Sequence, residues 1–322
     1  MNLDLLISNV TNPAFLFFIL GIIAVKLKSD LEIPPNSSKF ISLYLLFSIG
    51  FKGGQELSHE TFSSEIAWSM LFGIGISLLI PVYTFFILKR KLNIYDAGAI
   101  AAAYGSVSAV TFVTAVSYLD IQKLELHGHM VAIMALMESP AIIAGLILMS
   151  IFNKNDSDKV KPLSVVKHSI TNGSVLLILG SLVIGLLANA KQAEGIKPFT
   201  NDIFKGFLAI FLLDMGIVSG RKLSSFTNNG FFPLIFAIII PLVNGCAVAY
   251  LSSFVTHDVA NRFIFTVLAA SASYIAVPAA MKIAVPKANP GLFLPMALAV
   301  TFPLNITIGM PLYLSIVNFV NL

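Results

Sequence analysis

Long apolar runs alternate with short polar connections along almost the whole chain of 322 residues. Most runs are about 17–25 residues long, which is the length that an α-helix needs to cross the hydrocarbon core of a bilayer. Strands of a membrane barrel would instead alternate over about ten residues. The pattern therefore predicts an all-α membrane protein with about ten spans, at residues 12–28, 38–55, 66–88, 95–118, 130–152, 170–189, 201–221, 231–255, 261–283 and 292–317.

The composition fits this prediction and excludes the soluble classes. Hydrophobic residues make up 57% of the chain and charged residues 11%, whereas a soluble domain carries about 25% charged residues. The net charge of +4 comes from lysines and arginines in short loops, as in membrane-orientation signals, so we expect a lipid bilayer and no nucleic acid as partner. A single cysteine excludes an intramolecular disulfide and a cysteine-based metal cluster.

The distribution of basic residues predicts the orientation of the spans. With the N-terminus outside, the inner loops hold fourteen of the 20 lysines and arginines, and the outer loops hold four. Because basic residues concentrate on the cytoplasmic side, we expect both termini outside.

Two spans in different halves of the chain end in similar segments, FSIGFKGGQEL and LDMGIVSGRKL. Gly50 aligns with Gly216 and Gly54 with Gly220 at one offset, and weaker matches link the fifth span with the tenth. A repeat of five spans, an odd number, must lie inverted in the membrane, which is a known transporter architecture. We therefore expect a first five-helix repeat at residues 1–152, a cytoplasmic joint at 153–165 and an inverted repeat at 166–322.

The fourth and ninth spans contain helix-weakening residues at corresponding places near the midplane. The fourth contains YGSVSAVT and the ninth ASASYIAVP, and interrupted spans in both halves are the best sequence indication of a transporter's binding site. The new N–H ends favour an anion, and the new carbonyl ends with nearby hydroxyls suit Na⁺. The alternative is that these small residues only serve close helix packing. The predicted substrate-binding residues are Gly105, Ser106, Ser108, Thr111, Ser271, Ser273 and Tyr274, and Ser108 and Ser273 are also predicted ion ligands.

Three ionisable residues fall within the predicted spans, where each costs a few kcal/mol and is a functional candidate. Glu138 in the fifth span is a candidate cation ligand or proton carrier. Lys52 and Asp214 lie in repeat-related spans and are candidates for an intramembrane ion pair. Asn244 and Asn305 are polar and deep, which is typical of hydrogen bonds between helices.

The sequence pattern shows no other class of site. His127 and His129 fall in a predicted loop, where we expect them to be solvated, and no metal other than Na⁺ is predicted. No P-loop motif and no nucleophile–histidine–carboxylate spacing occurs, so neither ATP-driven transport nor enzyme activity is expected. Apart from Na⁺ as coupling ion, no cofactor is predicted.

Three segments at and after the two interruptions carry a family resemblance: GSVSAVT, ASASYIAVPAAMKIAVPKANP and FPLNITIGMPL. They resemble the sodium-dependent bicarbonate transporter family, and the resemblance extends over nearly the whole chain. It implies Na⁺-coupled uptake of bicarbonate across the bacterial inner membrane, with the anion between the two interruptions and Na⁺ beside it. The same resemblance implies a homotrimer and a cytoplasmic PII-like regulator.

Individual residues match this family unequally. Hydroxyl positions of the family's two breaks correspond to Ser108, Thr111, Ser271 and Ser273, and Glu138 stands where cyanobacterial members have an aspartate before a proline. The departures from the cyanobacterial pattern are Tyr274 for an aspartate, Ala276 for a serine, and Ala109 and Val110 for a Gly-Ser pair. The resemblance therefore implies a pocket with a less polar lining.

The sequence as a whole predicts a secondary transporter that carries bicarbonate in symport with Na⁺. A Na⁺- or H⁺-coupled transporter of another small inorganic or organic anion remains open, because Tyr274 is larger and less polar than aspartate. A membrane sensor or scaffold without transport also remains open.

Overall fold

The computed structural model describes residues 11–153, 173–226 and 230–320. All regular secondary structure in these ranges is helical, which confirms the predicted all-α class. Residues 154–165 of the predicted joint lie outside the described residues, as do the first residues of both predicted repeats.

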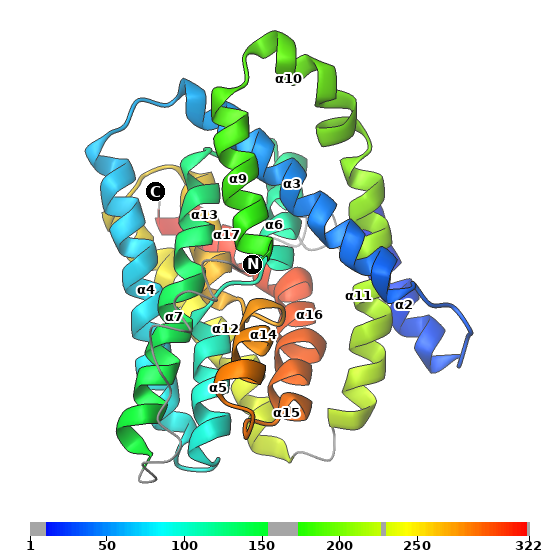
Figure 1. Cartoon of the computed structure of the whole chain (residues 1–322), viewed down its shortest axis with the longest axis vertical. Helices are drawn as coiled ribbons and strands as arrows, with labels where there is room; N and C mark the ends of the chain where they lie inside the picture. The colour runs from blue at the N-terminus through cyan, green and yellow to red at the C-terminus, as the bar shows by residue number, and fades with distance from the viewer. Residues whose placement is uncertain (1–10, 154–172, 227–229, 321–322) are drawn as a thin grey trace.

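Most of the helices fall on the predicted apolar segments, and residues 190–200, predicted as a connection, are helical as well (Figure 1). In the first half they are α2 (Pro13–Lys26), α3 (Pro35–His59), α4 (Ser64–Leu88), α5 (Ile94–Gly105), α6 (Ala109–Ile121) and α7 (His129–Phe152). In the second half they are α9 (Gly173–Leu187), α10 (Ala190–Lys197), η2 (Pro198–Asp202), α11 (Phe204–Phe226), α12 (Phe231–Leu251), η4 (Ser252–Phe254), α13 (Val259–Ala270), α14 (Ala276–Ala284), α15 (Pro290–Pro295), η5 (Met296–Thr301), α16 (Phe302–Leu304), η6 (Asn305–Gly309) and α17 (Met310–Val320).

Six helical stretches in the described part of the chain are long and apolar enough to cross a membrane. They are Ser64–Leu88, Ile94–Ile121, His129–Phe152, Ala190–Leu223, Phe231–Phe254 and Pro290–Val320. The apolar helices α2, α9 and α13 are shorter, and the 25 residues of α3 include polar residues such as Lys52 and Gln55. The protein is therefore a multi-pass helical membrane protein, while the count of ten spans stays a prediction.

The outward faces of the long helices are apolar. On α4, Leu71 and Leu79 are 58% and 63% exposed, and on α12, Ile235 and Val243 are 50% and 53% exposed. Water would penalise so much apolar surface, whereas lipid tails are as apolar as these side chains. These faces are suited to contact with lipid.

Glycines bring two pairs of helices into close contact. A Cβ atom on Gly54 of α3 would lie 2.1 Å from the Leu182 carbonyl oxygen of α9. A Cβ atom on Gly216 of α11 would likewise lie 2.1 Å from the Phe18 carbonyl oxygen of α2. Because no larger residue fits at either position, α3 packs on α9 and α2 packs on α11 almost backbone to backbone.

The broken helices occupy the interior of the protein. All residues from 96 to 108 and from 260 to 273 are buried. In Figure 1, α6 and α13 lie in the half that contains α10, and α5 and α14 lie in the opposite half. The segments that join α5 to α6 and α13 to α14 therefore lie at mid-height, inside the helical bundle.

Candidate functional site

The first interruption separates α5 from α6 at residues 106–108. Ser106 ends α5 with extended backbone (φ −82°, ψ 171°), and Ser108 begins α6 as its N-cap. The Ser108 Oγ accepts a hydrogen bond from the Thr111 N–H at 3.1 Å, which satisfies one of the first-turn donors. Gly105 allows Pro81 of α4 to approach, because a Cβ there would lie 2.2 Å from the proline ring. The predicted interruption is confirmed, and these residues build it.

The second interruption separates α13 from α14 at residues 271–275. Ser271 ends α13 with extended backbone (φ −83°, ψ 169°). Pro278 lies in the first turn of α14, where a backbone N–H would have no partner within the helix. The Ser273 Oγ accepts a weak hydrogen bond from the Val277 N–H at 3.4 Å. The proline therefore starts the new helix and does not itself end the old one.

Two hydrogen bonds join the interruptions directly. The Ser108 N–H donates to the Ser271 Oγ at 3.0 Å, across 163 residues of sequence. The Ser273 N–H donates to the Ala103 carbonyl oxygen at the end of α5 at 2.8 Å. The fold thus brings the two predicted breaks into one site.

A small cavity of about 20 Å³ lies where the interruptions meet. Its lining consists of residues 107–109, Glu138 and residues 273–276. This volume is enough for about one water molecule. Ala109 and Ala276, the first residues of α6 and α14, both line the cavity, so the positive ends of two helix dipoles face the same space.

The predicted substrate-binding residues divide into two groups in the structure. Ser108, Ser273 and Tyr274 line the cavity. The others lie around it and stabilise the interruptions: Gly105, Ser106, Thr111 and Ser271. Val107 and Ile275 also line the cavity, which the sequence did not predict. They are apolar, so only their position inside the interruptions could have indicated them.

Two asparagines bind carbonyl groups at the end of α13. Asn244 of α12 donates to the Ala269 carbonyl oxygen at 3.2 Å, and Asn305 of η6 donates to the Ala270 carbonyl oxygen at 2.7 Å. The prediction that both asparagines form hydrogen bonds between helices is confirmed. The sequence predicts that the carbonyls at such a helix end suit Na⁺, but these two are already bound by amides.

Glu138 of α7 supplies the carboxylate of the cavity and is 6% exposed. Its backbone carbonyl accepts a hydrogen bond from the Ser106 Oγ at 3.3 Å. Within the described part of the chain, the Glu138 side chain accepts no hydrogen bond. A buried carboxylate is costly unless a cation or a proton compensates it. With the hydroxyls of Ser108 and Ser273, the carboxylate offers the oxygen ligands that a hard cation prefers.

Tyr274 lies between the small cavity and a larger one of about 450 Å³. The larger cavity is lined mainly by α3 and α11, and Tyr274 and Ile275 of the second interruption line both spaces. The Tyr274 hydroxyl lies 3.8 Å from Met215 Sδ, and its ring packs edge-on against Phe302. A bulky aromatic ring thus separates the two spaces.

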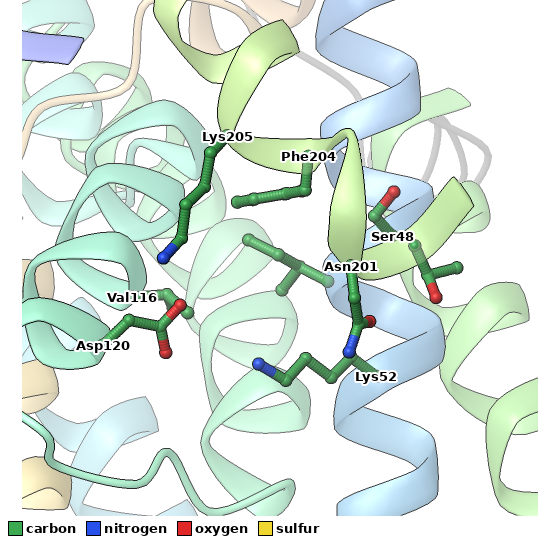
Figure 2. A pocket seen from close by; sticks show the side chains of 9 residues that line it. Ser48, Lys52, Val116, Asp120, Asn201, Phe204 and Lys205 are labelled. Carbon is green, nitrogen blue, oxygen red and sulfur yellow. The ribbon is translucent and has the colours of Figure 1, made fainter. Parts of the chain in front are cut away.

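Lys52 and Asp214 are not brought together. Asp214 accepts a hydrogen bond from the Ser38 Oγ near the start of α3 and lines the larger cavity. Lys52 lies fourteen residues further along α3, about 21 Å away at the rise of an α-helix. It lines a third cavity with Asp120 (Figure 2). Both residues are described by the structure, and no ion pair joins them.

A buried polar cluster links the ends of three helices. His129, at the start of α7, is 4% exposed, and its Nδ1 lies 2.6 Å from Glu60 Oε2. The Gly128 N–H donates to Glu60 Oε1 at 2.6 Å, and Asn261 of α13 lies 3.4 Å from His129 Nε2. The expectation that His129 is solvated is therefore wrong. Polar loop sequence around a histidine gives no signal that the folded chain buries it.

One protein family matches nearly the whole chain. A sequence model described as the Na⁺-dependent bicarbonate transporter superfamily matches residues 13–318. No curated protein matches the chain. The matched range includes both interruptions and Glu138.

Proposed function

We propose that this chain, which belongs to the Na⁺-dependent bicarbonate transporter superfamily, is a symporter. This is a family of transporters and not of enzymes, and it implies an anion substrate and Na⁺ dependence. We infer that the chain moves bicarbonate and Na⁺ together and binds both at the cavity between the interruptions.

One observation carries this proposal: the two breaks are hydrogen-bonded to each other, from the Ser108 N–H to the Ser271 Oγ. Two interrupted helices that meet inside a membrane protein expose helix termini to one small space. This is the arrangement in which secondary transporters bind substrates and coupling ions.

The anion is bound by the N-terminal ends of α6 and α14. Ala109 and Ala276 begin these helices and line the cavity. First-turn N–H groups and the helix dipole favour negative charge, and the hydroxyls of Ser108 and Ser273 add donors. Bicarbonate is small and carries three oxygen atoms, so it suits a site with several short donors.

Na⁺ is bound beside the anion by Glu138, Ser108 and Ser273. These side chains line one cavity and provide a carboxylate and two hydroxyl oxygens. A cation at the Glu138 carboxylate offsets the cost of its burial and attracts the anion. The two ligands therefore favour each other's binding, as symport requires.

The packing of the other helices supports the inverted repeat. α3 packs on α9, and α11 packs on α2, through glycines at repeat-related positions such as Gly50 and Gly216. A two-fold axis between the two halves would superpose the α3–α9 contact on the α11–α2 contact. We therefore propose ten spans in two inverted halves, in a bacterial inner membrane with both termini outside.

Uptake into proteoliposomes tests the proposal. The purified protein is reconstituted, and labelled bicarbonate uptake is measured with an inward Na⁺ gradient, with K⁺ replacing Na⁺, and in liposomes without protein. We expect uptake above the protein-free background only with Na⁺. Equal uptake with Na⁺ and K⁺ argues against Na⁺ coupling, and no uptake above background argues against bicarbonate.

A second candidate is a proton-coupled transporter of a small organic acid. The larger cavity favours it, because its volume of about 450 Å³ exceeds what bicarbonate needs and many of its lining residues are apolar. Glu138 would then carry the proton. A thermal-shift screen of anions in Na⁺ and in K⁺ discriminates, because a ligand of the folded state raises the unfolding temperature. Organic acids that stabilise equally in both salts would favour this candidate.

A further inference from the structure

A third cavity, of about 220 Å³, lies away from the interruptions, between α3, the end of α6 and the start of α11 (Figure 2). It shares no lining residue with the cavity at the interruptions. Asp120 and Lys205 are exposed and Lys52 is half-buried, so the cavity opens to the surroundings.

Two lysines and one aspartate face each other across this cavity. Figure 2 shows Lys205 and Lys52 extending from different helices toward the side of the cavity where Asp120 lies on α6. Among the residues that the structure describes, neither lysine forms a salt bridge with Asp120. The lining thus offers a small anion two ammonium donors and one carboxylate acceptor.

Uncharged polar side chains also line the cavity. Ser48 of α3 is 1% exposed, and the hydroxyl of Tyr44, one helical turn earlier, is its hydrogen-bonding partner. The amide of Asn201 lines the same space.

We propose that this cavity binds a small monovalent oxyanion that carries a hydroxyl group. The ammonium groups of Lys52 and Lys205 donate to the oxygens of the anion, and the Asp120 carboxylate accepts from its hydroxyl. Nitrate and chloride have no proton to donate, so Asp120 repels them. Naming bicarbonate as the member of this class that binds here rests on the proposed function.

The position of the cavity gives it a role in supplying the central site. Ser108 begins α6 at the interruptions, and Asp120 lies twelve residues later, about 18 Å along the helix. An anion held by the two ammonium groups at this distance is concentrated near the central site before it enters.

Lysine variants test binding and supply. Lys52→Gln, Lys205→Gln and the double variant remove donors from the cavity, and Lys191→Gln is the matched control, since Lys191 is exposed on α10 and outside the cavity. We expect each single variant to raise the KM for bicarbonate uptake about fivefold, the effect of losing a partly exposed charge contact of about 1 kcal/mol. If neither single lysine variant changes the KM for bicarbonate uptake, the cavity does not supply the central site.

Binding is measured separately from uptake, as the rise in unfolding temperature with bicarbonate or nitrate. We expect bicarbonate to stabilise the wild type more than the double variant, with Lys191→Gln like the wild type. An equal rise in wild type and double variant overturns the site, whatever the uptake. If bicarbonate raises the unfolding temperature only when the lysines are present, but the protein shows no bicarbonate uptake, the site is retained and the proposed function is rejected.

Asp120→Asn tests the role of the carboxylate. If Asp120 accepts from the hydroxyl of the anion, the asparagine variant loses the preference for bicarbonate over nitrate, because nitrate binding strengthens and bicarbonate loses its acceptor. An unchanged ratio between the two anions overturns the proposed selectivity for a hydroxyl-bearing anion.

Discussion

Ser108 donates its backbone N–H to the side-chain oxygen of Ser271, and both residues are buried, at 3% and 1% exposure. Ser108 also caps α6 through its own side chain. One residue therefore fixes the start of one half-helix and its contact with the other broken helix. We therefore expect this pair to contribute to the stability of the centre of the protein.

Ser271→Ala should destabilise the protein by about 1–3 kcal/mol, because it leaves the buried Ser108 N–H without an acceptor. The measurement is the thermal unfolding of the detergent-purified protein, in which the variant should unfold several degrees lower. Ser253→Ala is the control, since the exposed Ser253 hydroxyl only donates to a carbonyl of its own helical segment. Equal unfolding temperatures for Ser271→Ala and the wild type would show that the contact contributes nothing.

Glu138→Gln should raise the Na⁺ concentration for half-maximal uptake at least tenfold. The variant keeps the shape of the side chain but removes its charge, and a tenfold change corresponds to only about 1.4 kcal/mol of lost attraction. The measurement is bicarbonate uptake over a series of Na⁺ concentrations. Glu65→Gln, at an exposed position of α4, changes the net charge equally and should behave as the wild type. If Glu138→Gln retains the Na⁺ dependence of the wild type, Glu138 is not an Na⁺ ligand.

Gly54→Ala should destabilise the protein strongly, since the added Cβ would lie 2.1 Å from a backbone oxygen of α9. Gly180→Ala on α9 is the matched variant, because no atom lies within 4 Å of its added Cβ. Alanine favours a helix over glycine by about 0.5–1 kcal/mol in water, so Gly180→Ala should be neutral or slightly stabilising. Thermal unfolding of the two variants side by side measures the difference. Similar values would mean that the close contact between α3 and α9 is not needed.

Glu60→Ala should destabilise the protein by about 3 kcal/mol, because the Gly128 N–H and the His129 ring both lose their acceptor. His59→Ala, one residue earlier and exposed, should change the stability by less than about 0.5 kcal/mol. Chemical denaturation in detergent, followed by the fluorescence of Trp68, compares them. A Glu60→Ala variant as stable as His59→Ala would exclude a structural role for the cluster.

The helical fold could be predicted from the sequence because lipid imposes one simple requirement on each segment. A run of apolar residues must satisfy its own backbone, so its length alone indicates a helix. α3 is harder to recognise, because Lys52 and Gln55 reduce its apolar character while the helix still runs to His59. Gln55 donates to the carbonyl oxygens of Gly185 on α9 and of Ala188 just after it, and such distant partners cannot be read from a single segment.

The location of the candidate site could be predicted from the sequence, but which of its residues line the cavity and which stabilise the interruptions could not. Serine, glycine and proline weaken a helix locally, so the two interruptions have a sequence signal. Whether a serine side chain faces the cavity or the opposite side depends on the turn geometry inside the interruption. Ser273 lines the cavity, while Ser271 accepts from Ser108, although both lie in the same short segment. The burial of His129 by Glu60 depends on contacts between distant segments and has no local signal either.

The volume of the cavity at the interruptions, about 20 Å³, has a consequence for affinity. A space for one water molecule cannot hold both an oxyanion and a cation, so the proposed symport requires a second, more open form of this cavity that takes up the ligands. This opening consumes part of the intrinsic binding free energy, and the apparent affinity is the intrinsic affinity multiplied by the fraction of molecules already open. Variants that loosen the closed form, such as Ser271→Ala, should then bind the substrate more tightly while they unfold more easily. Among such variants, the unfolding temperature and the apparent substrate affinity are expected to change in opposite directions.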